Sequence, residues 1–97
     1  MLMIETIRND GAIVAIVIYS DYSVEGIKFI SPNDFSLQLG TMSRPAGYKV
    51  LPHIHNPVER HCVGTQEVLF IKSGKIRIDF YSFDKVYLES RELAAGD

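Results

Sequence analysis

Apolar and polar residues alternate in short runs along most of this chain. No stretch repeats its apolar residues at the 3.6-residue period of an amphipathic helix. Alternation with a period of two, interrupted by Gly, Pro, Asn and Asp, is typical of β-strands joined by turns. The pattern predicts strands over residues 2–7, 12–19, 27–30, 35–39, 48–55, 67–72, 75–81 and 85–89.

Turn-forming residues separate these predicted strands. Asn9, Asp10 and Gly11 form a tight-turn cluster, and Ser73 with Gly74 predicts a hairpin turn between residues 67–72 and 75–81. A further turn is expected at residues 82–84. Many short strands at close spacing are typical of an all-β sandwich or barrel. We therefore expect a single all-β domain over residues 1–97.

Composition and charge narrow the classes of function. The chain has 97 residues, of which 46% are hydrophobic and 23% charged, as in an ordinary globular domain. A net charge of -2 without a basic run argues against binding to nucleic acid or to an anionic membrane surface. The longest apolar stretch, residues 12–19, is too short to cross a bilayer. Cys62 is the only cysteine, so no intrachain disulfide is possible and a cytoplasmic location is expected.

Two histidines stand out in the predicted strand at residues 48–55. Side chains at alternate positions of a strand share a face, so Leu51, His53 and His55 point the same way. Pro52 lacks an N–H, which indicates an edge strand or a bulge at that position. A His-x-His pair by itself is also compatible with ordinary surface or hydrogen-bonded histidines.

A carboxylate in the predicted strand at residues 67–72 can complete a metal site. Glu67 shares a face with Leu69 and Ile71. If that face meets His53 and His55, two imidazoles and one carboxylate converge, a donor set that suits Fe, Mn, Ni or Zn. The sequence thus predicts a site for a divalent transition metal.

The spacing of these residues resembles the first conserved motif of the cupin superfamily. Gly47 is followed by five residues and then His53-Ile54-His55, and Glu67 is followed by six residues and then Gly74. The resemblance covers about residues 34–97 and implies a small jelly-roll β-barrel with a ligand site inside. It also implies that His53, His55 and Glu67 are metal ligands.

The segment between the histidines and Glu67 departs from the cupin pattern. Eleven residues separate His55 from Glu67, where the motif has three or four. Glu59 lies at the motif's distance from His55 and is the alternative carboxylate ligand. The extra residues form a loop that brings Arg60 and His61 near the site as substrate-binding residues, with Arg60 pairing with an anionic group.

The second cupin motif, with its further histidine ligand, has no counterpart in these residues, so we expect a C-terminally incomplete barrel. The chain is then either a fragment or is completed by a second copy in a homodimer.

The sequence is compatible with three functions. The first is a cupin that binds a divalent metal and a small polar ligand, such as a sugar-related metabolite of surface-polysaccharide biosynthesis. The second is a metal-free sugar isomerase or epimerase with a histidine base. The third is a non-catalytic ligand-binding or assembly domain, and whether the protein is an enzyme stays open.

Overall fold

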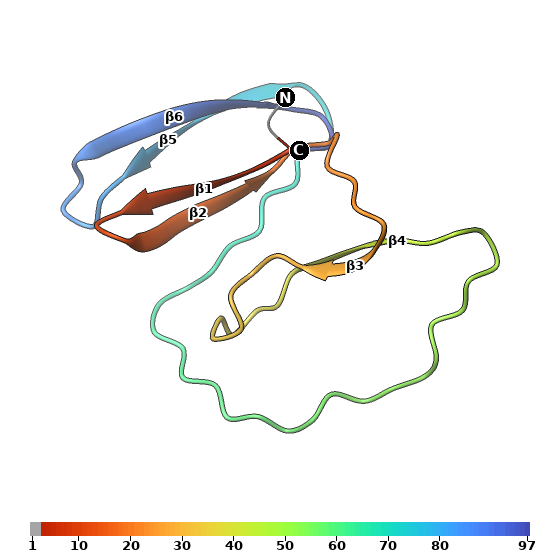
Figure 1. The fold of residues 1–97 in the computed structure, drawn as a ribbon. Helices are drawn as coiled ribbons and strands as arrows, with labels where there is room; N and C mark the ends of the chain where they lie inside the picture. The colour runs from red at the N-terminus through yellow and green to blue at the C-terminus, as the bar shows by residue number, and fades with distance from the viewer. Residues whose placement is uncertain (1–2) are drawn as a thin grey trace. The chain divides into compact units, whose positions relative to one another are not determined.

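The computed structural model describes residues 3–97, and these form six β-strands and no helix (Figure 1). The strands pair into three separate two-stranded antiparallel sheets, which confirms the predicted all-β character. Over the same residues, no helix has the length and apolarity needed to span a bilayer. The chain divides into two compact units: a terminal unit, Met1–Tyr22 with Val68–Asp97, and a central unit, Ser23–Glu67.

The first hairpin of the terminal unit joins β1 (Ile4–Asn9) to β2 (Ala12–Ile18). Asn9 pairs with Ala12, so Asp10 and Gly11 make a two-residue turn, with φ angles of 50° and 81°. Positive φ at both positions defines a type I′ turn, whose twist matches that of the strands. The predicted turn is confirmed, and so are both strands; Leu2, the first residue of the predicted strand, lies outside the described residues.

The second hairpin joins β5 (Lys75–Tyr81) to β6 (Tyr87–Ala94). The intervening turn is closed by the Ser82 N–H, which donates to the Val86 carbonyl at 2.8 Å. The predicted strand at residues 75–81 and the turn after it are confirmed. The last strand begins two residues later than predicted and extends to Ala94.

Side chains from both hairpins form the core of the terminal unit. Its buried apolar members are Ile7, Val17, Ile71, Phe80 and Leu93. Ile71 precedes β5, and its position is fixed by two backbone bonds to the end of the chain. Its N–H donates to the Asp97 carbonyl at 2.9 Å, and its carbonyl accepts from the Gly96 N–H at 2.8 Å.

An ionic network connects β1 to β6 beside this core. Arg91 donates from Nε and Nη2 to the two carboxylate oxygens of Glu5, both at 3.0 Å, and from Nη2 to Glu89 at 2.6 Å. The Tyr19 hydroxyl donates to the same Glu5 carboxylate. The Arg91 and Tyr19 hydrogen bonds lower the pKa of Glu5, and the bond to Glu5 raises the pKa of Tyr19.

Acid is therefore expected to destabilise the terminal unit through Glu5. Because the folded-state pKa of Glu5 lies below its ordinary value of 4.5, its contribution to stability is complete above that pH and is lost as the pH falls through the lowered pKa. Glu5→Gln should flatten the fall of the urea unfolding midpoint between about pH 5 and about pH 3. Glu92→Gln removes the same charge from an exposed β6 position and should leave that fall unchanged. Equal pH profiles for wild type and Glu5→Gln would contradict this assignment.

The central unit contains one short hairpin-like pair, β3 (Gly26–Phe29) with β4 (Gly40–Ser43). The predicted strand at residues 27–30 is confirmed. The strand predicted at residues 35–39 is wrong, because side-chain hydrogen bonds fold these residues into a turn. The Ser31 hydroxyl accepts from the Leu39 N–H at 2.8 Å, and the Gln38 amide donates to the Phe35 carbonyl at 2.6 Å.

Two further predicted strands, at residues 48–55 and 67–72, are also wrong. Neither segment has a neighbouring strand with which to form a ladder. The hairpin predicted at Ser73 and Gly74 is wrong as a consequence, because β5 takes β6 as its partner. Among residues 3–97 no hydrogen-bonded pairing joins the three sheets into a closed barrel, so the jelly roll stays a prediction.

Candidate functional site

A side-chain-capped turn at residues 31–38 forms one side of the candidate site, within the central unit. The Gln38 side-chain amide donates to the carbonyl of Pro32 at 3.0 Å as well as to that of Phe35. Residues in such turns have no β-ladder to satisfy their backbone, so side chains supply the missing partners. The turn therefore presents its carbonyl oxygens in a fixed arrangement.

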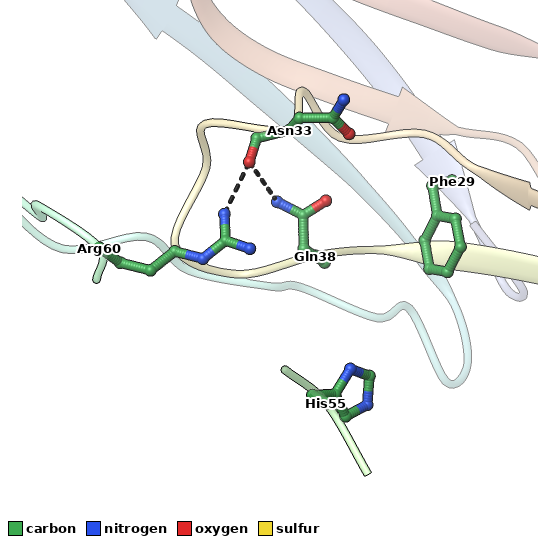
Figure 2. A pocket seen from close by; sticks show the side chains of 5 residues that line it. All are labelled: Phe29, Asn33, Gln38, His55 and Arg60. Atoms are coloured by element: carbon green, nitrogen blue, oxygen red, sulfur yellow. Dashed lines mark hydrogen bonds between the residues drawn. The ribbon is translucent and has the colours of Figure 1, made fainter. Parts of the chain in front are cut away.

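Arg60 binds to this turn from the long segment that follows β4. Its Nη1 donates to the Asn33 carbonyl at 2.6 Å and to the Phe35 carbonyl at 3.0 Å, and Figure 2 shows the Asn33 oxygen shared between Arg60 and Gln38. Both acceptors are neutral, and among the described residues Arg60 has no ion pair. The guanidinium is thus held in place while its positive charge stays uncompensated.

An open cleft of about 280 Å³ lies beside this turn, lined by Phe29, Asn33, Gln38, His55 and Arg60. Figure 2 shows the imidazole of His55 on one side, and Gln38 with the Phe29 ring on the opposite side. The lining combines one cation, an imidazole, two amides and an aromatic ring. Such a set can hydrogen-bond the polar groups of a small molecule and fix its orientation.

The two predicted metal-binding histidines lie side by side. The ring centroids of His53 and His55 are 5.4 Å apart, with the rings at 69°. A nitrogen of His53, Nδ1, lies 3.0 Å from the Leu51 carbonyl oxygen. Since a carbonyl can only accept, Nδ1 donates this hydrogen bond, and in the neutral ring Nε2 is then the acceptor. A backbone carbonyl on the other ring nitrogen is the usual way in which a metal-binding histidine is oriented.

The structure does not gather a third metal ligand. Within residues 3–97, no three His, Cys, Asp or Glu side chains come close enough to hold an ion. Glu67 and the alternative, Glu59, are both exposed, and neither lines the cleft. His53 and His55 lie close to each other, and the three-ligand set of His53, His55 and Glu67 stays a prediction.

Of the two predicted substrate-binding residues, Arg60 and His61, one lines the cleft and the other does not. Arg60 lines the cleft with His55, but His61 is exposed and does not line it. Cys62 is an exposed free thiol; its sulfur accepts from the Ser36 hydroxyl at 3.5 Å. Arg60 and Cys62 thus attach the segment to residues 33–36.

Three lining residues, Phe29, Asn33 and Gln38, were not predicted as site residues. Phe29 and Gln38 lie in predicted strands, at ordinary alternating positions, and Asn33 lies between those strands. The local signal in the sequence is the run of turn-forming residues Ser31, Pro32, Asn33 and Asp34, which indicates a bend rather than a ligand site.

Comparison with known proteins found no family model, no curated protein and no solved structure that matches this chain. The cupin resemblance therefore rests on the residues of this sequence alone.

Proposed function

We propose that this protein binds a small polar ligand with a negatively charged group in the cleft of the central unit. The observation that carries the proposal is the pairing of Arg60 and His55 at one cleft, although both come from a segment without regular structure. Arg60 is held by two neutral carbonyls and retains Nε and Nη2 as donors. An arginine so placed suits carboxylate or phosphate, which it can bind through two parallel hydrogen bonds.

The rest of the lining supports a polar ligand with a flat or apolar portion. The Phe29 side chain is 59% exposed and offers its surface to the cleft, while the imidazole of His55 can donate or accept. A sugar phosphate has this combination of features: a ring, hydroxyl groups and an anion. It also agrees with the sugar-related metabolites expected from the sequence.

Removing the guanidinium is expected to weaken binding of an anionic sugar. Arg60→Ala should raise the Kd for glucose 1-phosphate about 10-fold, because one charge-assisted interaction at an exposed site is lost. Isothermal titration calorimetry with glucose 1-phosphate and with glucose measures the effect. Lys49→Ala, an exposed cation of the same segment outside the cleft, is the matched control. The proposal would be contradicted if wild type bound glucose 1-phosphate and glucose with equal affinity. It would also be contradicted if Arg60→Ala and Lys49→Ala lowered the affinity for glucose 1-phosphate equally.

A second candidate function, binding of a divalent transition metal, is favoured by the orientation of His53. Its Nε2 is available as an acceptor, and His55 lies beside it. A bound ion supplies Lewis-acid chemistry or an activated water. The residues that would hold it are His53 and His55, with Glu67 or Glu59 as the carboxylate.

Metal content separates this candidate from simple ligand binding. About one equivalent of Zn, Ni, Mn or Fe per chain is expected after equilibrium dialysis. A His53→Ala, His55→Ala double variant should lose it, because two of its nitrogen donors are gone. Comparing Glu67→Gln with Glu59→Gln identifies the carboxylate ligand, because only the substitution of that residue should weaken binding of the metal. Unchanged metal content in the double variant excludes the site.

We retain the cupin-type jelly roll as the proposed fold of the metal-binding form. Its support is the spacing of Gly47, His53, His55, Glu67 and Gly74. In such a barrel the histidine segment and residues 67–72 would be neighbouring strands. Amide hydrogen exchange tests this: protection at residues 50–55 and 67–72 is expected when the metal is added, and no protection contradicts it.

A further inference from the structure

Gly40, the first residue of β4, is a glycine that its own backbone conformation does not require. Of the seven glycines in the chain, all of them within the described residues, six have a positive φ and Gly40 does not. A residue with a side chain can adopt such a conformation, and glycine weakens a strand because it loses more conformational freedom on folding. The reason for a glycine at this position therefore lies in its surroundings.

The aromatic ring of Phe29 occupies the space beside Gly40. The two residues lie directly opposite each other in the β3–β4 register. A Cβ on Gly40 would lie 3.0 Å from both Cδ1 and Cε1 of the ring. This is closer than the roughly 3.5–4.0 Å at which carbon atoms pack. The ring therefore keeps this position only while residue 40 has no side chain, and an aromatic ring beside a glycine of the neighbouring strand is a recurrent pairing.

The ring that Gly40 accommodates is part of the cleft in the same unit. Phe29 is largely exposed and lines the cleft together with Gln38 and Arg60. Figure 2 shows Gln38 between the guanidinium of Arg60 and the ring of Phe29. The lining thus offers a positive charge toward one end and an apolar aromatic surface toward the other. A ligand that uses both needs an anionic group and a ring or other apolar face.

We propose that Gly40 is a positioning residue for Phe29, and that Phe29 selects phosphorylated ligands with a sugar ring over acyclic ones. This inference rests on the proposed function, since Arg60 binds the phosphate, and adds to it a requirement for the ring. The C–H groups on one face of a sugar ring form an apolar surface that can pack against the aromatic ring. The cleft of about 280 Å³ is at the small end for ligand sites and suits a single ring.

Two phosphates of equal charge test the selection by isothermal titration calorimetry. Wild type should bind glucose 1-phosphate about 5-fold more tightly than glycerol 1-phosphate, because only the former packs against Phe29. Phe29→Ala and Gly40→Ala should each reduce this preference to less than about 2-fold and leave the affinity for glycerol 1-phosphate unchanged. Gly40→Ala acts by displacing the ring, which is exposed and can move aside. Met42→Ala is the matched control, because Met42 is an exposed residue of β4 outside the cleft, and it should keep the wild-type preference.

A double variant tests whether Gly40 acts through Phe29. Adding Gly40→Ala to Phe29→Ala should change the preference no further, since the ring to be displaced is already gone. A further change in that background would overturn the positioning role. So would an equal loss of affinity for both phosphates in Gly40→Ala, or a Gly40→Ala chain that does not fold by circular dichroism, because either result means that Gly40 serves the strand itself.

The wild-type affinities separate this inference from the proposed function. If glucose 1-phosphate and glycerol 1-phosphate bind equally, and both more tightly than glucose, the anion site stands and the selection by Phe29 is overturned. If neither phosphate binds more tightly than glucose, both proposals are overturned.

Discussion

Ile7→Ala is expected to lower the free energy of unfolding of the terminal unit by roughly 3 kcal/mol. Ile7 is 1% exposed and is the most deeply buried of the five core residues. It lies on β1 beside the register shift between Ile7 and Arg8, so the strand is already irregular next to it. The core is small: its five buried residues have the partly buried Ala15, Tyr19 and Ile78 packed against them. Urea denaturation followed by circular dichroism measures the loss.

Two milder variants define the cause of that loss. Ile7→Val removes one methylene and should cost about 1 kcal/mol. Val14→Ala removes apolar atoms from β2 at a position that is 39% exposed, and should change stability by less than about 0.5 kcal/mol. An Ile7→Ala loss no larger than that of Val14→Ala would show that the terminal unit does not depend on this core.

The parts of the fold that could be predicted are those in which local and tertiary preferences agree. Asp10 and Gly11 adopt positive φ, and the flanking apolar residues pair across the turn. In β5, Phe80 is buried and Arg77, on the opposite face of the strand, is exposed. In the β1–β2 hairpin, turn chemistry and alternation predict the same structure, so the two signals support each other.

The strand predictions that were wrong are mainly those in which the strand needs a partner distant in the sequence. Residues 48–55 and 67–72 alternate as strands do, but alternation specifies a face and not a neighbour. Residues 35–39 failed for a different reason, since Ser31 and Gln38 satisfy the backbone locally. Side-chain capping of this kind is hard to predict, because Ser and Gln also occur on the outer faces of strands.

Of the residues that line the cleft, only those that follow one another in the chain could be predicted from the sequence. Arg60 was expected near the histidines because it follows them in the loop, and it lines the cleft with His55. His61 is its neighbour in sequence, yet adjacent residues of an extended chain point in opposite directions, and His61 does not line the cleft. Phe29 and Gln38 contribute through the β3–β4 pairing, which brings together residues that are separate in the sequence.

Gly96→Ala is expected to destabilise the terminal unit by roughly 2–4 kcal/mol, through backbone strain and a steric clash together. Gly96 has a φ of +93°, a conformation that residues with a Cβ rarely adopt. A Cβ at this position would lie 2.9 Å from the Cβ of Ser20, too close for two carbon atoms. Ser20 cannot easily move, because its N–H donates to the Asp97 carboxylate at 2.8 Å. The displacement would also strain the bond from the Gly96 N–H to the Ile71 carbonyl, which holds a core residue in place.

Gly11→Ala separates the two causes. Gly11 has a similar φ of +81°, but a Cβ there would have no atom within 4 Å, so only the strain remains and the cost should be about 1 kcal/mol. Adding Ser20→Gly to Gly96→Ala removes the clashing carbon and should recover the part of the loss that exceeds the Gly11→Ala value. If Gly96→Ala and Gly11→Ala cost the same, Ser20 does not restrict this position, and the contact between Ser20 and the end of the chain is looser than the Asp97 hydrogen bonds imply.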